Sequence, residues 1–576
     1  MELRKVNKEL RKLPLSDEPF RKIIEGNYLY SDKTEYIHKM IDSYTCCFLS
    51  RPRRFGKTLL IKTIEELFRG NRELFDGLWI GKKNRCAFER HPVLRFNMTF
   101  AEIKTGQDLV DRIKRELIKA AKNEDVTISS PSFDEMLNEL LESLYKKYGV
   151  GAVILIDEYD APVTMHISDR NLAGDNRDVL HGFYTALKTH VDYIRFAFVT
   201  GITRFAMTDL DFGANNFMDI SLDPEFSGIC GFPVSELESL FGDRFDEMLD
   251  KLKSKGQIRQ SADREALKAE ILKWYDGYNW LGSEHVLNPY SILYFFKDRN
   301  LRGYWPLSGH PSHLMALVRE RPLEFVQPSL DSLFSMNVRR VDLGTLEAVP
   351  LLFHGGYLTI DEEELKETGE KGAEGEPILE EAFTFRNPNQ EVRAHYKSSI
   401  FKGAFGLRNE YFGIFAKNLR SALLEKDSEK MGETLRDLLH TIVHMHHKSD
   451  ESFYHSMFQA SFVAAGLEAR SEEGGSRGDA DMAIFLDGKV RVVIEVKYVK
   501  AEEKIGQGGD GDKDRAAREL ASALDRAENA IREKRYAGSF RLAASEIICL
   551  ALAVRGRDEV AARFLAPDGA GEPPSS

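Results

Sequence analysis

A glycine, a lysine and a threonine at adjacent positions give this 576-residue chain its first stretch suited to phosphate chemistry. They end the run Ser50-Arg-Pro-Arg-Arg-Phe-Gly-Lys-Thr58, which lies between an apolar, strand-like segment and a helical pattern. In a strand, loop and helix of this kind, backbone N–H groups hold phosphates, the lysine adds a positive charge and the hydroxyl binds Mg²⁺. The residues expected to bind a nucleotide here are Arg54, Gly56, Lys57 and Thr58, the last also as a metal ligand.

One position departs from the usual form of this loop. A glycine normally stands five residues before the second glycine, and this chain has Arg51 there. A residue with a Cβ makes the required turn less readily than glycine does. The alternative interpretation is therefore a basic turn that opens an ordinary helix.

A second group of residues that could take part in catalysis follows the apolar run Ala152-Val-Ile-Leu-Ile156. Such a run is typical of a strand buried on both faces of a parallel sheet. Asp157 and Glu158 end this run, at the edge where open α/β sheets bind their ligands. We expect Asp157 to hold Mg²⁺ through water or Thr58, and Glu158 to polarise the attacking water. The alternative is a strand that ends in a charged turn.

A third strand, predicted at 194–200, ends in Thr200-Gly-Ile-Thr-Arg204. Some nucleotidases have an added strand between the phosphate loop and the acidic strand, with a polar residue that senses the terminal phosphate. Thr200 is predicted to have this role. Arg204 has two open interpretations, which are stabilisation of charge on the phosphate and pairing with an acid.

A separate group of acids and a lysine lies in a predicted hairpin at 478–497. Alternation along its second strand puts Glu495 and Lys497 on one face. A two-residue turn at 487–488 would turn Asp481 to the other face, whereas a three-residue turn with a bulge at 487–489 brings Asp481 beside Glu495. Catalysis by these carboxylates therefore requires the three-residue turn.

Two converging carboxylates are ligands that suit a hard cation such as Mg²⁺. The expected metal ligands are Asp481, Glu495 and the backbone carbonyl of Val496, and Glu451 is a further candidate. Lys497 would position or deprotonate a water and stabilise charge on a phosphate, so this set suits hydrolysis of a phosphodiester. The alternative is an exposed strand with an ordinary Glu/Lys alternation.

Length and composition limit the classes of protein that can carry these groups. A chain of 576 residues with 42% hydrophobic residues predicts two to four globular domains. A net charge of -12 argues against a protein that coats polyanions over its whole surface, so contact with nucleic acid must be local. Five cysteines without paired spacing suit a reducing compartment, and no apolar run approaches the roughly 18 residues of a membrane span. We therefore expect a cytoplasmic protein without a membrane partner.

Taken together, these motifs are similar to those of a bacterial and archaeal family that joins an AAA-like ATPase domain to a PD-(D/E)xK nuclease-superfamily domain. Further markers of the resemblance are Ser31-Asp-Lys-Thr34, Leu155-Ile-Asp-Glu-Tyr-Asp160, Trp274-Tyr-Asp-Gly-Tyr278, Leu352-Phe-His-Gly-Gly-Tyr-Leu-Thr359 and Glu451-Ser-Phe-Tyr-His455. The family typically has arginine at position 51. It usually has Gly-Arg-x-Asp where this chain has Gly478-Asp-Ala-Asp481, and it often has glutamine where Ala530 stands.

The resemblance implies an α/β protein that binds ATP in its first domain, with Asp481, Glu495 and Lys497 as the nuclease triad of the second. We expect a P-loop ATPase domain with a helical lid at 1–298, a connecting region at 299–400, a restriction-endonuclease-like domain at 401–566 and a disordered tail at 567–576. An acidic, glycine-containing stretch at 361–377 is expected to be an exposed loop.

The predicted function is a Mg²⁺-dependent nuclease that acts on DNA under the control of ATP. The alternative, from a different class, is a nucleotide-dependent switch or scaffold whose nuclease-like domain binds nucleic acid or a protein without cleaving. Self-assembly into a homo-oligomer is also open, because AAA-like ATPases often assemble. A lysine and an aromatic residue in Tyr28-Leu-Tyr-Ser-Asp-Lys-Thr34 either contact a nucleotide base or only pack against the sheet.

Overall fold

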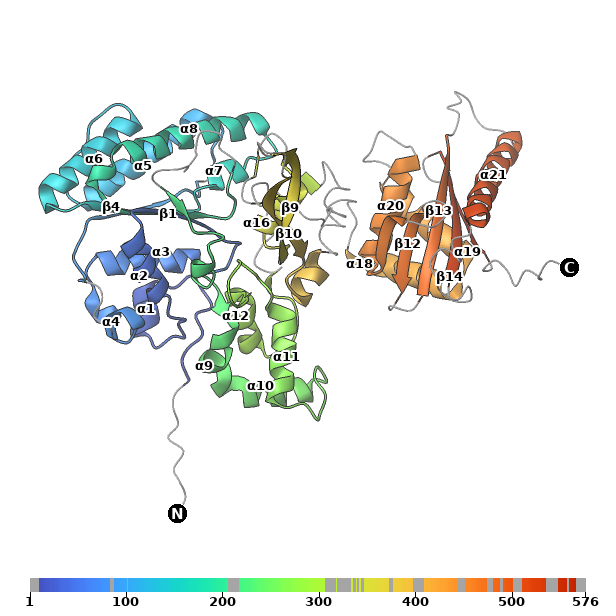
Figure 1. Cartoon of the computed structure of the whole chain (residues 1–576), viewed down its shortest axis with the longest axis horizontal. Coiled ribbons are helices and arrows are strands. Elements are labelled where there is room, and N and C mark those ends of the chain that lie inside the picture. Colours follow the sequence, from blue (N-terminus) through green and yellow to red (C-terminus); the bar gives the residue numbers. More distant parts are fainter. Residues whose placement is uncertain are drawn as a thin grey trace, which may run out of the picture. The chain divides into compact units, whose positions relative to one another are not determined.

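The computed structural model of the chain divides into two compact units (Figure 1). Unit 1 comprises residues 1–314 and 329–395, and unit 2 comprises residues 315–328 and 396–576. The residues that the structure describes are 10–82, 87–100, 102–205, 217–305, 317–318, 333–334, 338, 341–342, 346–371, 377–396, 409–442, 451–473, 480–486, 490–500, 510–534, 547–556 and 559–565. The tail expected at 567–576 lies outside these residues.

The centre of unit 1 is a parallel sheet with the strand order β2-β3-β4-β1-β5. Its strands are β1 (Cys46–Ser50), β2 (Val93–Asn97), β3 (Ala152–Asp157), β4 (Ile194–Gly201) and β5 (Met218–Asp219). Every residue of β1 and β3 is buried, because α5, α6 and α8 cover one face of the sheet and α1–α3 the other (Figure 1). Strand β4 lies between β1 and β3, so the added strand expected between the phosphate loop and the acidic strand is confirmed, as is the α/β fold class.

The helices around this sheet begin and end at signals that are visible in the sequence. Thr105 and Asp108 form a capping box at the start of α5, and Gly149 ends α6 in the left-handed conformation with a φ of 71°. The helices are α1 (Phe20–Glu25), α2 (Thr34–Ser43), α3 (Lys57–Phe68), α4 (Trp79–Lys82), α5 (Gly106–Asn123), α6 (Phe133–Tyr148), α7 (Ala161–Thr164) and α8 (Arg170–Thr189).

A helical layer with its own apolar core follows the sheet in the chain. It contains the two-stranded pair β6 (Phe232–Pro233) and β7 (Val286–Leu287) and the helices α9 (Leu237–Phe241), α10 (Phe245–Ser254), α11 (Arg264–Tyr275) and α12 (Pro289–Asp298). Phe241 and Phe296 stack in its core with their ring centroids 4.4 Å apart. Helices therefore occur where the sequence predicts a lid.

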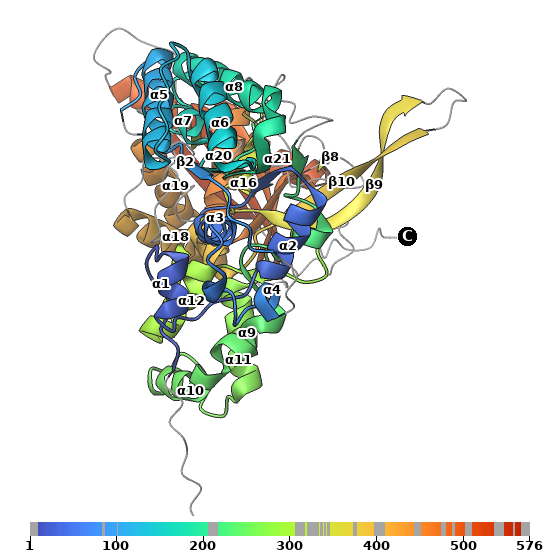
Figure 2. The same cartoon turned by 90° about the vertical axis from the view of Figure 1, so that its left-hand side faces the viewer.

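The segment expected to connect two domains is divided between the units: residues 299–314 and 329–395 belong to unit 1, and residues 315–328 and 396–400 belong to unit 2. The described helix and strands of this segment lie in unit 1. They are α16 (Ala348–His354), β8 (Leu333–Phe334), β9 (Thr359–Lys371) and β10 (Pro377–Arg386). The prediction of an exposed loop at 361–377 is wrong for the described residues. There β9 and β10 pair as an antiparallel hairpin that stands out from the unit (Figure 2). Its residues 361–367 are exposed, which explains why their sequence has the composition of a loop.

Unit 2 is built on a mixed sheet with the strand order β11-β12-β13-β14-β15. These strands are β11 (Glu468–Glu473), β12 (Ala480–Leu486), β13 (Val490–Val499), β14 (Ile547–Arg555) and β15 (Glu559–Leu565). The parallel pair β13 and β14 is joined through α21 (Asp510–Lys534), whose Ala523 and Ala527 pack against Val493 and Ala551. The other helices are α18 (Asn409–Glu425), α19 (Ser428–Ile442) and α20 (Glu451–Ala464).

The register of the hairpin β12–β13 decides whether the carboxylates of unit 2 can meet. Met482 pairs with Ile494, and Leu486 pairs with Val490. This is the register that a three-residue connection produces, so the predicted register is confirmed. The turn itself, with its expected bulge, falls on residues 487–489, which lie outside the described residues. Among the helices that the structure describes, none is both long enough and apolar enough to cross a bilayer.

Candidate functional site

The loop between β1 and α3 has the backbone conformation that a phosphate loop requires. Gly56 caps α3 with a φ of 93°, and Arg54 also has a positive φ, of 69°. A Cβ at Gly56 would contact nothing within 4 Å, so the left-handed φ, not a lack of space, is what favours glycine there. The buried ammonium of Lys57 donates to the carbonyls of Arg51 and Pro52, at 3.0 and 3.2 Å. The loop thus curls around its own lysine.

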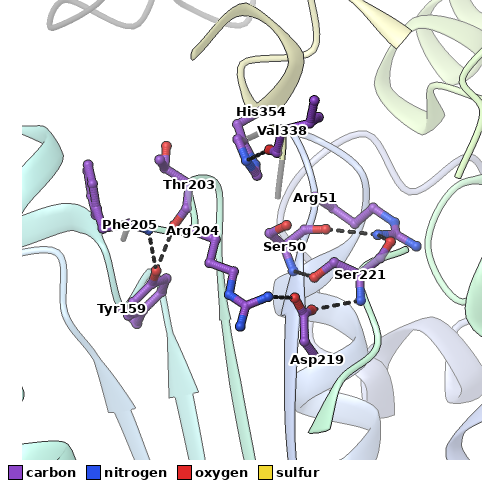
Figure 3. Close-up of polar contacts among 10 residues, drawn as sticks. All are labelled: Ser50, Arg51, Tyr159, Thr203, Arg204, Phe205, Asp219, Ser221, Val338 and His354. Atoms are coloured by element: carbon purple, nitrogen blue, oxygen red, sulfur yellow. Dashed lines mark hydrogen bonds and ion pairs between the residues drawn. The ribbon is translucent and has the colours of Figure 1, made fainter. Parts of the chain in front are cut away.

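Arg51 fills the position of the missing glycine and acts as an anchor (Figure 3). Its side chain is 1% exposed, and its guanidinium donates to the carbonyls of Ser50 and Ser221, at 2.9 and 2.6 Å. The guanidinium also lies 4.5 Å from the ring centroid of Trp280. Burial lowers the pKa of Arg51 to about 10, which still leaves it charged. These contacts fix the start of the loop without the turn that glycine would make.

Asp157 reaches the phosphate loop as predicted. Its Oδ2 accepts a 2.8 Å hydrogen bond from the hydroxyl of Thr58, and its Oδ1 accepts from the backbone N–H of Glu158. Burial raises the pKa of Asp157, and the hydrogen bond from Thr58 opposes this shift. Glu158, directly after the strand, has a φ of 51° and is only partly buried. The structure therefore brings together the hydroxyl and carboxylate expected to hold Mg²⁺.

A cavity of about 610 Å³ opens over this loop within unit 1. That size falls in the range of cavities that hold small-molecule ligands, which is roughly 300–1,000 Å³. Its lining includes the predicted residues Arg54, Gly56, Lys57, Thr58 and Glu158.

Thr200 and Arg204 do not line the cavity. Thr200 is fully buried, and its hydroxyl donates a 2.7 Å hydrogen bond to the carbonyl of Leu49 on the neighbouring strand. Arg204 forms an ion pair with Asp219 at the end of β5, so the second of its two interpretations is the one found (Figure 3). The phosphate-sensing arrangement predicted for Thr200 is not present, because its polar atom bonds to the backbone inside the sheet.

Two positioning residues were not predicted, although they stand in the marker Leu155–Asp160. The carboxylate of Asp160 accepts hydrogen bonds from the backbone N–H groups of Ile202 and Thr203, at 3.2 and 2.8 Å. Tyr159 donates its hydroxyl proton to the carbonyl of Thr203 and accepts from the N–H of Phe205 (Figure 3). Burial, and next the charge of Glu158, raise the pKa of Asp160 to about 6. These residues fasten the end of β4 beside the acidic strand.

In unit 2, the ammonium of Lys497 lies among oxygen atoms from several elements. It is 3.2 Å from a carboxylate oxygen of Glu451 and 3.6 Å from one each of Asp481 and Glu495. It also donates to the carbonyl of Val496, at 3.1 Å. Burial by itself lowers the pKa of Lys497, but the three carboxylates outweigh it and the pKa is raised. The side chain is therefore held as an ammonium.

Backbone groups hold the carboxylates of this cluster in place. Asp481 Oδ2 accepts a 2.8 Å hydrogen bond from the N–H of Val496, and Glu451 accepts one from the N–H of Tyr498. Glu495 is completely buried beneath them. The sequence did not identify His455, whose Nε2 contacts the carbonyl of Asp481 from α20. The sequence signal that could have identified His455 is its place in the marker Glu451–His455.

The donor set of unit 2 fits a hard divalent cation. Asp481, Glu495 and Val496 supply carboxylate and carbonyl oxygens, the ligand types that Mg²⁺ takes, and all three already surround one positive charge. Within the part of the chain that the structure describes, no three His, Cys, Asp or Glu side chains lie close enough together to form a metal cluster by themselves. The carbonyl of Val496 is the predicted third ligand beside Asp481 and Glu495, and it lies 3.1 Å from the ammonium of Lys497.

Comparison with known proteins found one family model that matches in each unit. Residues 14–211 match a family model described as predicted AAA-ATPase, and residues 449–563 match one described as PD-(D/E)XK nuclease superfamily. An uncharacterised protein in the vnfD 5′ region of Azotobacter chroococcum mcd 1 is 30% identical over 522 residues, which cover 88% of this chain and 94% of that protein. This relative matches the chain along nearly its whole length, and both family models match in order. The chain therefore belongs to the family that joins a predicted AAA-ATPase domain to a PD-(D/E)XK nuclease-superfamily domain.

Proposed function

We propose that unit 1 binds and hydrolyses ATP and that unit 2 is a Mg²⁺-dependent nuclease that cleaves DNA under nucleotide control. The observation that carries the nuclease proposal is the meeting of three carboxylates and a backbone carbonyl around Lys497. An exposed strand with an ordinary Glu/Lys alternation would not bury Glu495 completely or draw acids from two further elements toward one lysine.

In unit 1, each group has a defined part in ATP hydrolysis. The N-terminus of α3 and Lys57 bind the phosphates, and Thr58 with Asp157 would hold Mg²⁺. Glu158 lines the cavity and orients the attacking water. Tyr159 and Asp160 position Glu158 indirectly, since they tie the residues that follow it to the end of β4.

In unit 2, Asp481, Glu495 and the carbonyl of Val496 would hold Mg²⁺. When bound, the ion supplies Lewis-acid activation of the phosphate and lowers the pKa of a water. Lys497 would position or deprotonate the water and stabilise negative charge on the phosphate as the P–O bond breaks. Glu451 and the N–H of Val496 keep the lysine and Asp481 in position.

A row of basic residues on α21 supports nucleic acid as the polymeric substrate. Arg515, Arg518 and Arg526 line a cavity of about 560 Å³ together with Glu519, which pairs with Arg515. Val499, also in the lining, is two residues beyond Lys497 on the same face of β13. Their spacing puts the arginines along one side of the helix. Guanidinium groups in such a row bind the phosphates of a backbone without reading its bases. This local basic surface agrees with an acidic chain that contacts DNA in one place.

The proposal is tested by cleavage of a panel of single- and double-stranded DNA and RNA with Mg²⁺ or Mn²⁺, with and without ATP. We expect metal-dependent cleavage of DNA that changes with ATP and that is lost in Lys497→Ala. The exposed Lys500 provides the matched control, Lys500→Ala, which should cleave like wild type. Equal cleavage by wild type and Lys497→Ala would assign the activity to a contaminant. ATP binding without any cleavage would favour the switch or scaffold.

A further inference from the structure

A second lysine, apart from that of the phosphate loop, faces the cavity of unit 1. Lys33 lines this cavity but is only 8% exposed. Its ammonium makes no hydrogen bond with any residue that the structure describes, and the carboxylate nearest to it in an ion pair, that of Glu236, lies at 4.0 Å. Such a buried and poorly satisfied cation is costly unless a ligand completes its bonding.

The segment around Lys33 is rigid, because its neighbours are anchored on the opposite side. The carboxylate of Asp32 accepts from the N–H and the hydroxyl of Thr34 and from the N–H of Trp79 at the start of α4. Thr34 in turn accepts from the N–H of Ile80. The side chains of the marker Ser31–Thr34 thus alternate in direction. Asp32 and Thr34 bond to α4, and Ser31 and Lys33 line the cavity.

The position of this segment along α3 separates it from the phosphates. The hydroxyl of Tyr30 lies 3.4 Å from that of Thr63, six residues after Lys57 on α3. At 1.5 Å of rise per residue, this contact is about 9 Å from the phosphate-binding end of the helix. A nucleotide whose phosphates bind at Lys57 would therefore present its nucleoside part to the Tyr30–Lys33 segment.

The chemistry beside Lys33 favours a base over a phosphate. Glu236 accepts a 2.5 Å hydrogen bond from Ser31 and places its carboxylate next to the ammonium. Phosphate oxygens only accept hydrogen bonds and would be repelled by this carboxylate. The edge of a nucleobase carries acceptors beside N–H donors, so it matches a lysine and a glutamate placed side by side.

We propose that Lys33 donates a hydrogen bond to the base of the bound nucleotide, with the carboxylate of Glu236 accepting from the same base edge. This inference rests on the proposed binding of ATP by unit 1. It resolves the open interpretation of Tyr28–Thr34 in favour of contact with the base.

The test compares ATP with inorganic tripolyphosphate, which lacks the nucleoside, by calorimetric titration of the full chain in Mg²⁺. Lys33→Met should raise the Kd for ATP about 10- to 100-fold, the loss expected for a hydrogen bond from a charged donor, and leave the Kd for tripolyphosphate unchanged. Lys57→Met should weaken both ligands. Lys39→Met, at an exposed lysine of α2, should change neither.

The outcomes separate this inference from the function on which it rests. If wild type binds no ATP, the proposed nucleotide binding itself fails. If wild type binds ATP and Lys33→Met binds it equally well, only the base contact is overturned. Equal weakening of ATP and tripolyphosphate by Lys33→Met would overturn the placement of Lys33 at the base.

A measurement on wild type covers the case in which Lys33→Met does not fold. Acetylation of lysines, followed residue by residue with mass spectrometry, should be blocked at Lys33 by ATP and not by tripolyphosphate. Lys57 should be protected by both ligands. Equal labelling of Lys33 with and without saturating ATP would contradict the proposal.

Discussion

The two sites of this chain each combine a lysine with acidic residues beside a sheet, but they hold the lysine in opposite ways. In unit 1, backbone carbonyls of the loop hold Lys57, and Asp157 bonds to a hydroxyl instead. In unit 2, three carboxylates surround Lys497. A lysine on neutral carbonyls can exchange them for phosphates at little cost, whereas a lysine among carboxylates leaves a site with excess negative charge. The first arrangement suits binding of an anion, and the second suits binding of a cation.

The largest expected effects come from neutralising one acid in each unit. Glu495→Gln removes a metal-binding charge and should lower DNA cleavage about 100- to 1,000-fold, with ATP hydrolysis within twofold of wild type. Asp157→Asn should lower ATP hydrolysis by a similar factor and remove the response of cleavage to ATP, with nucleotide-free cleavage intact. Steady-state assays of both activities on both variants provide the measurement.

The control for this pair is Glu533→Gln, an exposed acid on α21, which should leave both activities unchanged. Loss of both activities in either variant, with both proteins folded, would show that the two sites are not chemically separate and would contradict the comparison.

The sequence predicted much of this comparison because its signals are local. The buried run of β3 ends at Asp157, and alternation along β13 puts Glu495 and Lys497 together. The register of β12 against β13 was predicted from the requirement that the carboxylate of Asp481 lie beside that of Glu495. These inferences depend on spacing within one element or one hairpin, which a single sequence shows.

Contacts between distant parts of the chain could not be predicted in the same way. The hydroxyl of Thr200 bonds to Leu49, which is 151 residues away, and no local pattern shows whether a polar atom at a strand end faces a ligand or a neighbouring strand. The exposed parts of the hairpin, residues 361–367 and 377–381, have the composition of a loop, because composition reflects exposure more directly than backbone conformation.

Unit 1 is also expected to respond to pH through a buried acid outside the cavity lining. Glu391 accepts hydrogen bonds from Ser291 and from the N–H groups of Tyr304 and Trp305, yet burial raises its pKa to about 7. A raised carboxyl pKa favours the folded state while the group is protonated. This contribution is present below about pH 4.5 and is lost as the pH rises through about 7, and it amounts to about 3 kcal/mol.

Urea unfolding between pH 5 and pH 8, followed by tryptophan fluorescence, measures this effect in unit 1 alone, because all four tryptophans (Trp79, Trp274, Trp280 and Trp305) belong to that unit. The free energy of unfolding should fall toward pH 8 in wild type and change less in Glu391→Gln. Equal slopes in the two proteins would contradict the assignment to Glu391.

The smallest effects on activity are expected from substitutions in the row of arginines on α21. These substitutions test the contrast between the phosphate-binding loop of unit 1, which is buried, and the proposed DNA-binding surface of unit 2, which is exposed. Arg518→Gln and Arg526→Gln should each weaken DNA binding a few-fold and lower the slope of log K against log salt by about 1, since each arginine neutralises about one phosphate. Fluorescence anisotropy at several salt concentrations measures this slope. An unchanged slope in the double variant would place the DNA elsewhere on the chain.

The central claim is that unit 2 holds a divalent cation between Asp481 and Glu495, and a Mn²⁺-soaked crystal of the full chain tests it most directly. The account predicts an anomalous peak bonded to both carboxylates and to the carbonyl of Val496, and no such peak in Glu495→Gln. An empty site at saturating Mn²⁺, in protein that cleaves DNA with the same metal, would contradict it.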